Sequence, residues 1–266
     1  MIDIYGANES RLNDFSTVNG VFAELCKVLN LTSVMPPFIL PYYYARDALD
    51  DGISAFVFLL GGHITIHTFP ERRCLFLDIM YDGYYDEMKL KSILKNYFFY
   101  DIINCVHTDR RFYDTLIDKT LIYDKNNENK DFGPHTIARI EDVNVSFEQL
   151  FEMLDDMPSK ISMTPISRPY VIKSTPHNTD YLSGIVLIAQ SHIAFHYSIK
   201  ERRLYCDCFS CSFYEVENFA NYLKQYFSNV ESMTIIRGSA HVDARATRAD
   251  KINDLSAWMK PLRRKK

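Results

Sequence analysis

Residues 54–67 read Ser54-Ala-Phe-Val-Phe-Leu-Leu-Gly-Gly-His-Ile-Thr-Ile-His67, and residues 183–196 read Ser183-Gly-Ile-Val-Leu-Ile-Ala-Gln-Ser-His-Ile-Ala-Phe-His196. The two stretches align at an offset of 129 residues, and without gaps to Phe98 and Phe227 they share 13 of 45 positions. Self-similarity at a fixed offset marks a chain built from like structural units. The 266 residues therefore form two units of about 130 residues each.

Each unit is predicted to contain the same elements in the same order. It opens with a helix, at Phe15 to Leu29 or Phe147 to Leu154, because apolar residues recur there at helical spacing. An irregular stretch rich in proline and aromatic residues follows. Three strands rich in aliphatic and β-branched residues come next, the first two joined by a tight turn, and a second helix closes the unit. The strands are predicted at 53–60, 63–69 and 74–81 and at 182–189, 192–197 and 204–210, and the closing helices at 85–98 and 214–227.

This order predicts an α+β fold. Strands that cluster between helices favour an antiparallel sheet with helices on one face. We expect two tandem sheets of this kind, packed as a pseudo-dimer in an αββα-type sandwich. The first repeat is expected at 1–123, a polar linker at 124–135 and the second repeat at 136–266.

The C-terminal segment is expected to lie outside the repeat. From Arg237 to Lys266 it has nine Lys or Arg residues against three Asp or Glu. We interpret it as a short docked helix with a solvated basic tail, and binding of an acidic partner is the alternative.

Composition indicates a globular protein and excludes several classes. Hydrophobic residues make up 47% and charged residues 24%, which is ordinary for a folded domain, and a net charge of -4 gives no reason to expect nucleic acid as a partner. The longest apolar run, Ala55 to Leu60, is far shorter than a membrane span. Six cysteines and no secretory leader favour a soluble, reduced, cytoplasmic protein without a membrane partner.

Histidine and cysteine residues in the strands raise the alternative of a metal site. Residues two apart in a strand share a face, so His63 and His67 point the same way, as do His192 and His196. Imidazole and thiolate groups are common zinc ligands. However, the chain contains no CxxC pair, and buried free cysteine is common, so we expect no metal.

The two copies differ where a nucleophile would be needed. The first has the turn Gly61-Gly62 and the second has Gln190-Ser191, and Asp82 of the first corresponds to Cys211 of the second. If two-fold packing builds each site from both units, one composite site combines two groups of residues. The second unit supplies Ser191 and Cys211, and the first supplies Ser54, His67 and Glu71. The reciprocal site would lack a nucleophile.

These residues resemble the S-adenosylmethionine decarboxylases. Gln190-Ser191-His192-Ile-Ala-Phe-His196, with Cys211 twenty residues after the serine, is similar to the self-processing segment of that family. His63-Ile-Thr-Ile-His67-Thr-Phe-Pro-Glu71 is similar to the family stretch that follows it, with Phe69 in place of Trp. In this family bacterial chains are single units that dimerise and eukaryotic chains are fused pairs. The present chain looks like a fused tandem of two bacterial-type units.

The resemblance implies a self-processing pyruvoyl enzyme, made as a zymogen. Ser191 attacks the carbonyl of Gln190, the chain is cut autocatalytically between them, and a pyruvoyl cofactor forms at position 191. The pieces would be residues 1–190 and 191–266. His67 is implied as the base, with Ser54 beside it to hold the oxyester. The substrate amine then forms a Schiff base, and Cys211 returns a proton after carbon dioxide leaves.

The implied substrate is a small molecule, S-adenosylmethionine, decarboxylated for polyamine and spermidine biosynthesis. Glu71 matches the family residue that binds the ribose hydroxyls, and Phe69 is expected to contact substrate. Family members place a stacking Phe where this chain has Ala48, and Tyr44 or Phe69 is the candidate substitute. The alternatives are an arginine or ornithine decarboxylase, or a non-catalytic regulator. The resemblance leaves a homodimer of the pseudo-dimer open.

Four further residues are interpreted as structural. His63 and His192 are expected to be satisfied strand residues. His196 and Ser183 match the motif but belong to the reciprocal site, so they are interpreted as remnants.

Overall fold

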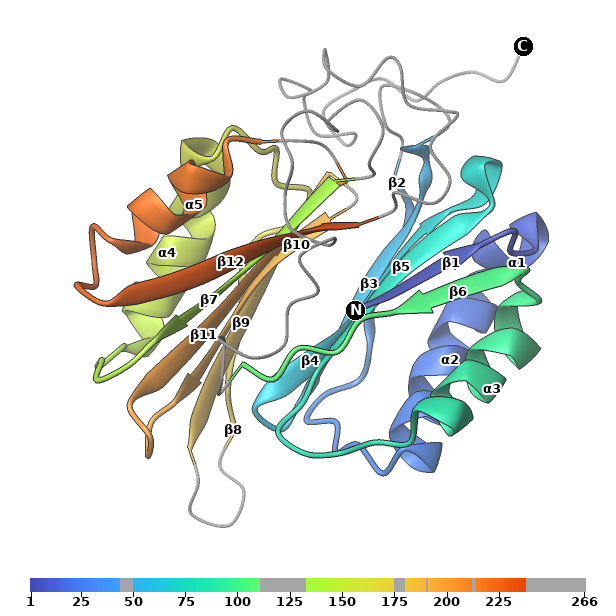
Figure 1. The fold of residues 1–266 in the computed structure, drawn as a ribbon, viewed down its shortest axis with the longest axis horizontal. Helices are drawn as coiled ribbons and strands as arrows, with labels where there is room; N and C mark the ends of the chain where they lie inside the picture. The colour runs from blue at the N-terminus through green and yellow to red at the C-terminus, as the bar shows by residue number, and fades with distance from the viewer. Residues whose placement is uncertain (44–49, 111–132, 175–179, 190, 212–213, 238–266) are drawn as a thin grey trace.

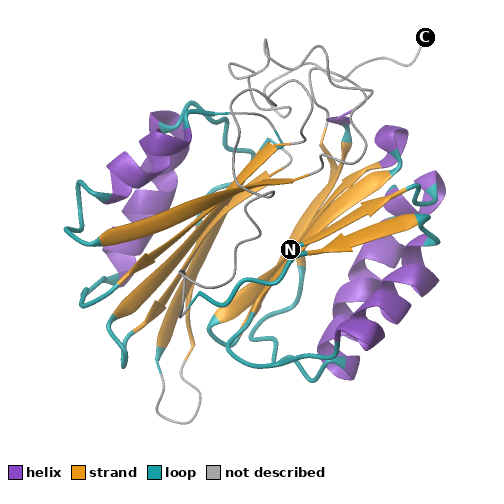
Figure 2. Cartoon of the chain, viewed as in Figure 1, coloured by secondary structure: helices purple, strands orange, loops and turns teal. Residues whose placement is uncertain are grey.

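The computed structural model describes residues 1–43, 50–110, 133–174, 180–189, 191–211 and 214–237. Two antiparallel six-stranded sheets face each other, and helices cover the outer face of each sheet (Figures 1 and 2). This is the predicted α+β sandwich of two tandem units.

The first unit forms one sheet in the order β2-β3-β4-β5-β1-β6. Its main helices are α2 (Phe15–Val28) and α3 (Glu87–Phe98), preceded by the single turn α1 (Glu9–Leu12). The strands are β1 (Ile2–Tyr5), β2 (Phe38–Tyr43), β3 (Gly52–Leu59), β4 (Gly62–Phe69), β5 (Cys74–Met80) and β6 (Ile102–Cys105), and the short 3-10 turn η2 (Pro70–Arg72) joins β4 to β5.

The second unit repeats this arrangement. Its sheet has the order β12-β7-β11-β10-β9-β8, which is the first order with each strand replaced by its counterpart and read from the opposite edge. The helices are α4 (Phe147–Lys160) and α5 (Val216–Leu223). The strands are β7 (Gly133–Ile140), β8 (Tyr170–Ser174), β9 (Tyr181–Ile188), β10 (Ser191–Ser198), β11 (Arg203–Phe209) and β12 (Val230–Arg237).

Local sequence explains the best-predicted elements. The Asp14 carboxylate accepts hydrogen bonds from the backbone N–H groups of Ser16 and Thr17, which caps α2 at its N-terminus. Ser146 caps α4 in the same way through the backbone N–H of Gln149. Between β3 and β4, Gly61 has φ +72°, a conformation that side chains disfavour, and this allows the tight turn.

The three strands predicted in each unit are confirmed, but each sheet contains six strands. The stretches expected to be irregular contain the edge strands β2 and β8, and each sheet also includes β1 or β7 and β6 or β12. The strand β7 begins at Gly133, so the last three residues expected in the linker belong to the second sheet. Arg237, expected outside the repeat, is the last residue of β12.

Two helix predictions also differ from the structure. The helix expected to end at Leu154 continues to Lys160 with Pro158 inside it, and the helix expected from Tyr214 to Phe227 spans only Val216–Leu223.

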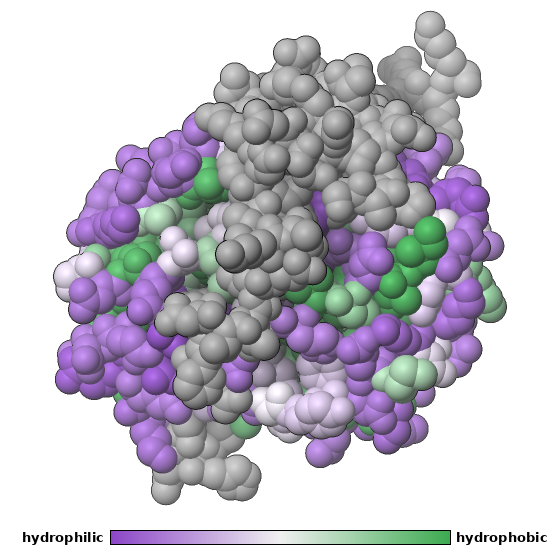
Figure 3. All heavy atoms as spheres, viewed as in Figure 1, coloured by the Kyte–Doolittle hydropathy of each residue, from purple (hydrophilic) through white to green (hydrophobic). Residues whose placement is uncertain are grey.

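The buried apolar side chains lie in three layers, one between each sheet and its own helices and one between the two sheets. Ile53, Ala55 and Val57 point from β3 toward the helices of the first unit, and a matching cluster fills the second unit. The alternate residues Phe56 and Phe58 point inward and pack between the sheets. On the face shown in Figure 3, hydrophilic residues predominate over both halves, and hydrophobic ones appear as separate patches. The pleat of β3 thus directs Ser54, which shares the inward face with Phe56 and Phe58, into the middle layer.

No helix in the part of the chain that the structure describes is both long and apolar enough to cross a membrane.

Candidate active site

Four buried histidines meet in the middle layer, two from each unit. His67 Nε2 lies 2.9 Å from His192 Nδ1, and His63 Nδ1 lies 2.7 Å from His196 Nε2. His67 Nδ1 lies 3.0 Å from the Ser54 hydroxyl. The two units therefore share one hydrogen-bonded chain, Ser54–His67–His192.

The equivalent hydrogen-bonded chain, related to the first by the pseudo-two-fold axis, lies beside it. His196 Nδ1 is 2.9 Å from the Ser183 hydroxyl, and His196 continues to His63. The sequence predicted that the two histidines of each strand share a face, but not that the two pairs join across the sheets.

Burial keeps these histidines neutral near pH 7. It lowers the pKa of His63 to about 4 and that of His67 to about 3. The pKa values of His192 and His196 are also lowered well below the usual range by burial, and a neighbouring histidine lowers each further. Each neutral imidazole has one N–H and one bare nitrogen, so it can donate one hydrogen bond and accept another.

Ser191 and Cys211 are in direct contact. The Ser191 hydroxyl oxygen accepts a hydrogen bond from the Cys211 backbone N–H at 2.8 Å, and the Cys211 thiol donates to the Ala189 carbonyl oxygen at 3.4 Å. Cys211 thus binds the chain on both sides of position 190, although Gln190 itself lies outside the described residues. Ser191 is fully buried and Cys211 nearly so.

Aromatic rings pack around this end of the site. Cys211 belongs to a buried cluster with Phe69, Phe76 and Phe209. The Phe69 ring is fully buried and meets Phe76 edge to face at 5.8 Å between centroids.

Glu71 is exposed on η2, directly after β4. The next residue, Arg72, forms a buried ion pair with Asp50 at 2.8 Å, which fixes this turn against the start of β3. Tyr44, a candidate stacking residue, and Ala48, the position at which family members have a stacking Phe, lie outside the described residues.

The reciprocal position cannot hold a nucleophile as it is built. A Cβ atom at Gly62 would lie 2.0 Å from the Met80 backbone carbonyl oxygen, so a serine there would require the strand to move. Ser198 occupies the position equivalent to Phe69. A cavity of about 690 Å³ opens at this end, and its lining includes Gly61, His63, Asp82, Tyr181, His196 and Ser198.

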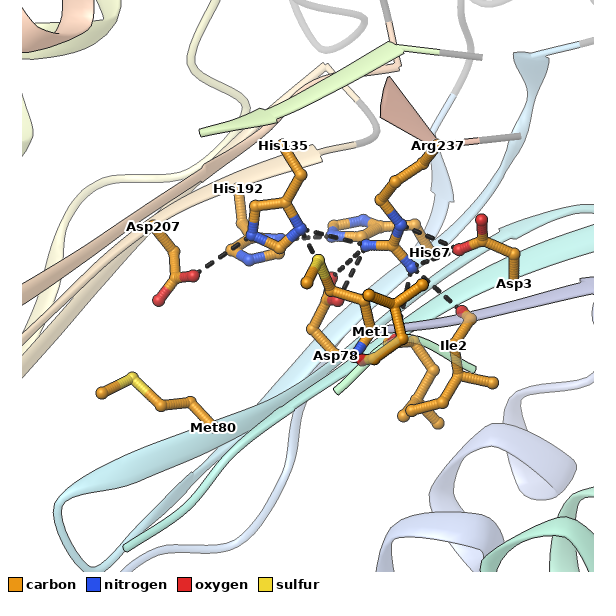
Figure 4. A network of polar contacts seen from close by, with 12 residues as sticks. Met1, Ile2, Asp3, His67, Asp78, Met80, His135, His192, Asp207 and Arg237 are labelled. Atoms are coloured by element: carbon orange, nitrogen blue, oxygen red, sulfur yellow. Dashed lines mark hydrogen bonds and ion pairs between the residues drawn. The ribbon is translucent and has the colours of Figure 1, made fainter. Parts of the chain in front are cut away.

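An ion network that the sequence did not reveal crosses the interface (Figure 4). Arg237 donates to both carboxylate oxygens of Asp78 at 2.7 Å, and also to Asp3. Arg110 donates to Asp207 through two nitrogens, one to each carboxylate oxygen, whereas a single Arg237 nitrogen, Nη1, serves both oxygens of Asp78. Asp78 and Asp207 are identical residues at the 129-residue offset of the repeat, whereas Arg110 and Arg237 are 127 residues apart.

The two arginines are not aligned at the 129-residue offset, because equivalent residues of the last strands are separated by a different number of positions. Cys105 of β6 pairs with a residue of β1, and Ser232 of β12 pairs with the equivalent residue of β7. Arg110 lies five residues after Cys105, and Arg237 lies five residues after Ser232. The offset is therefore 127 here rather than 129.

His135 links the two ion pairs. It lies 3.1 Å from Asp207 through Nε2, and its Nδ1 lies 3.3 Å from an Arg237 nitrogen. Burial alone would raise the pKa of Asp78, but the charges of Arg237 and His135 lower it well below its ordinary range. Asp78 is therefore ionised near pH 7 and paired with Arg237.

One group of described residues is close enough to hold a metal ion: Asp78, His135 and His192, with one ligand atom from each within 4.8 Å of the others. Arg237 already binds both carboxylate oxygens of Asp78 and contacts His135. A fixed positive charge in that position opposes a divalent cation.

A model of one protein family matches most of the chain. It is described as S-adenosylmethionine decarboxylase and covers residues 1–111 and 137–238, one segment in each unit. No individually curated protein matches the sequence.

Proposed function

Because the chain belongs to the S-adenosylmethionine decarboxylase family, we propose that it is a self-processing, pyruvoyl-dependent enzyme that decarboxylates S-adenosylmethionine for polyamine biosynthesis. The observation that carries this proposal is the pairing of Ser191 with Cys211. A serine hydroxyl at the start of β10 is bound by the Cys211 N–H, and the thiol of the same residue contacts the carbonyl of Ala189. This arrangement holds the nucleophile and the preceding chain together.

The first reaction rearranges the bond between Gln190 and Ser191. Ser191 Oγ forms a bond to the Gln190 carbonyl carbon, the C–N bond breaks, and the hydroxyl proton moves to the nitrogen. This gives an ester in the same chain. The Cys211 N–H, 2.8 Å from Oγ, fixes the attacking oxygen.

The second reaction cuts the chain. A base removes the Cα proton of residue 191, the Cβ–Oγ bond breaks, and Gln190 leaves with a free carboxylate. The dehydroalanine that remains takes up water and loses ammonia to give the pyruvoyl group. His67 is the proposed base, because it matches the histidine to which the family resemblance assigns this role and its Nδ1 lies 3.0 Å from the Ser54 hydroxyl.

The described residues fit a pyruvoyl group at position 191. That group would supply a ketone that takes up the substrate amine and withdraws electrons as carbon dioxide leaves. The Cys211 N–H that now binds Oγ would remain as a hydrogen-bond donor there. The Cys211 thiol is the proposed donor of the proton to the substrate carbon, and Glu71 on η2 is the proposed ligand of the ribose hydroxyls.

The substrate is tested by measuring carbon dioxide release. We expect the purified, cleaved protein to release labelled carbon dioxide from carboxyl-labelled S-adenosylmethionine, and not from arginine or ornithine. Release from a basic amino acid would instead assign the chain to the alternative decarboxylases. A cleaved chain that acts on none of the three would contradict the proposed substrate class, and an intact, inactive chain would support the regulator.

A further inference from the structure

His192 follows the proposed nucleophile directly and is fully buried. Its Nδ1 lies 2.9 Å from His67 Nε2, and the planes of the two rings are within 7° of each other. Its other nitrogen, Nε2, is buried and has no hydrogen-bond partner among the described residues. A buried polar atom of this kind is costly, so its surroundings should explain it.

The Asp78 carboxylate lies close to the His192 ring. A ring nitrogen of His192, one of His135 and a carboxylate oxygen of Asp78 all lie within 4.8 Å of one another. Because His67 engages Nδ1, Nε2 is the His192 nitrogen available to Asp78. A separation of up to 4.8 Å can be spanned by one hydrogen-bonded water.

The charge on Asp78 decides the direction of the hydrogen bonds. A proton on His192 Nε2 faces the ionised carboxylate of Asp78, whereas a bare nitrogen would present its lone pair to the same carboxylate. With the proton on Nε2, the neutral ring has a bare Nδ1, which must accept from His67. His67 then carries its proton on Nε2 and has a bare Nδ1 toward Ser54.

We propose that His192 is a positioning residue, held by Asp78, that fixes His67 in the tautomer whose Nδ1 is free to accept a proton. This inference rests on the proposed function, because it assigns His67 the role of base. The order Asp78, His192, His67, Ser54 extends the logic by which a carboxylate orients a catalytic histidine. Asp78 remains ionised, and no bond is made or broken at His192.

The equivalent hydrogen-bonded chain at the reciprocal site, Ser183–His196–His63, supplies the matched control. His63 holds His196 through the same atoms as His192 holds His67, and it is equally buried. The turn beside His63 has Gly62 and no nucleophile. Changes at His63 should therefore perturb packing in the same way without affecting cleavage.

The test compares two replacements at each position. Asparagine offers an acceptor near the position of Nδ1, and phenylalanine fills the space without one. We expect the rate of self-cleavage of His192→Asn to be within about 10-fold of that of the unchanged chain. The rate for His192→Phe should be about 100-fold lower or more, as when a general base is impaired. His63→Asn and His63→Phe should both cleave within about threefold of the unchanged chain.

Three outcomes would overturn the inference. His192→Phe cleaving as fast as His192→Asn would show that only volume matters, and His63→Phe being as slow as His192→Phe would show a general packing defect. An unchanged chain that never splits would overturn the proposed function, and this inference with it.

A second measurement does not depend on cleavage. Ser191→Ala should keep the chain whole, so nitrogen-15 histidine spectra of that variant report the tautomers in the uncut protein. We expect His67 and His192 both to carry their protons on Nε2. A proton on His67 Nδ1 would overturn the inference while leaving the proposed function intact. This readout also applies if His192→Phe does not fold.

Discussion

The Arg237 guanidinium donates to both carboxylate oxygens of Asp78 at 2.7 Å, although the two residues belong to different units of the chain. Arg110 and Asp207 repeat this contact in the opposite direction. Each unit thus supplies an arginine that neutralises the buried aspartate of the other. The two sheets are therefore joined by reciprocal ion pairs as well as by apolar packing.

Removing Arg237 should destabilise the protein strongly. Arg237→Met leaves Asp78 and Asp3 as buried charges without their main partner, and breaking such a pair costs about 3–5 kcal/mol. The free energy of unfolding in urea measures this loss. Arg168→Met is the control, because Arg168 pairs with Asp155 at the surface and should contribute under about 1 kcal/mol. Equal effects of the two changes would contradict the account.

The buried histidines should make the protein sensitive to mild acid. Burial lowers the pKa of His63 to about 4, whereas an unfolded chain has a histidine pKa near 6.5. The unfolded state binds more protons between these values, so stability is full above pH 6.5 and falls as the pH drops toward 4. Within this pH range, each such histidine lowers the free energy of unfolding by about 1.4 kcal/mol for each unit by which the pH falls.

Urea unfolding at pH 7 and at pH 5 tests this dependence. His63→Asn removes one titrating group, so its stability should fall less steeply than that of the unchanged chain. Asp78 cannot produce this loss: its pKa is lowered in the folded state, so its contribution declines only below about pH 4. Equal stability at pH 7 and pH 5 would show that the histidines are not held neutral.

Ser54 and Ser183 should differ in their effect on self-cleavage, although each is buried and hydrogen-bonded to a histidine. Ser54→Ala removes the partner of His67 and should slow cleavage by about 10-fold or more. Ser183→Ala removes the equivalent partner at the reciprocal site and should leave the rate unchanged. The rate of appearance of the two pieces on a denaturing gel distinguishes them, and equal slowing would contradict a site in only one copy.

Cys211 should separate processing from decarboxylation. Its backbone N–H binds Ser191, and Cys211→Ala keeps that group, so the chain should still cut itself. Loss of the thiol removes the proposed proton donor, and carbon dioxide release should fall by about 100-fold. Cleavage and carbon dioxide release are followed on the same sample. Full decarboxylation by Cys211→Ala would exclude the thiol from that role.

The parts of the fold that could be predicted are those with local signals. The strands on either side of Gly61 are buried on both faces and are rich in aliphatic, aromatic and β-branched residues, and their histidines recur in the second unit. The edge strand β2 was missed because it contains Pro41, which is typical of edges and irregular segments. The register of β2 against β3 indeed shifts between Leu40 and Tyr43.

The site was predictable where one residue type differs between otherwise similar copies, as at Ser191 and Gly62. The contacts between the sheets were not predictable, because no local pattern indicates which side chains meet across an interface. His67 and His192 are 125 positions apart, and Arg237 and Asp78 are 159 apart. Only the packing of the two units brings these groups together.

Intact-mass measurement of the purified full-length protein is the direct test of self-cleavage at Ser191. We expect pieces of residues 1–190 and 191–266, the second with a ketone in place of its N-terminal amine, and a single full-length mass for Ser191→Ala. A single full-length mass for the unchanged chain, or cleavage that persists in Ser191→Ala, would contradict it.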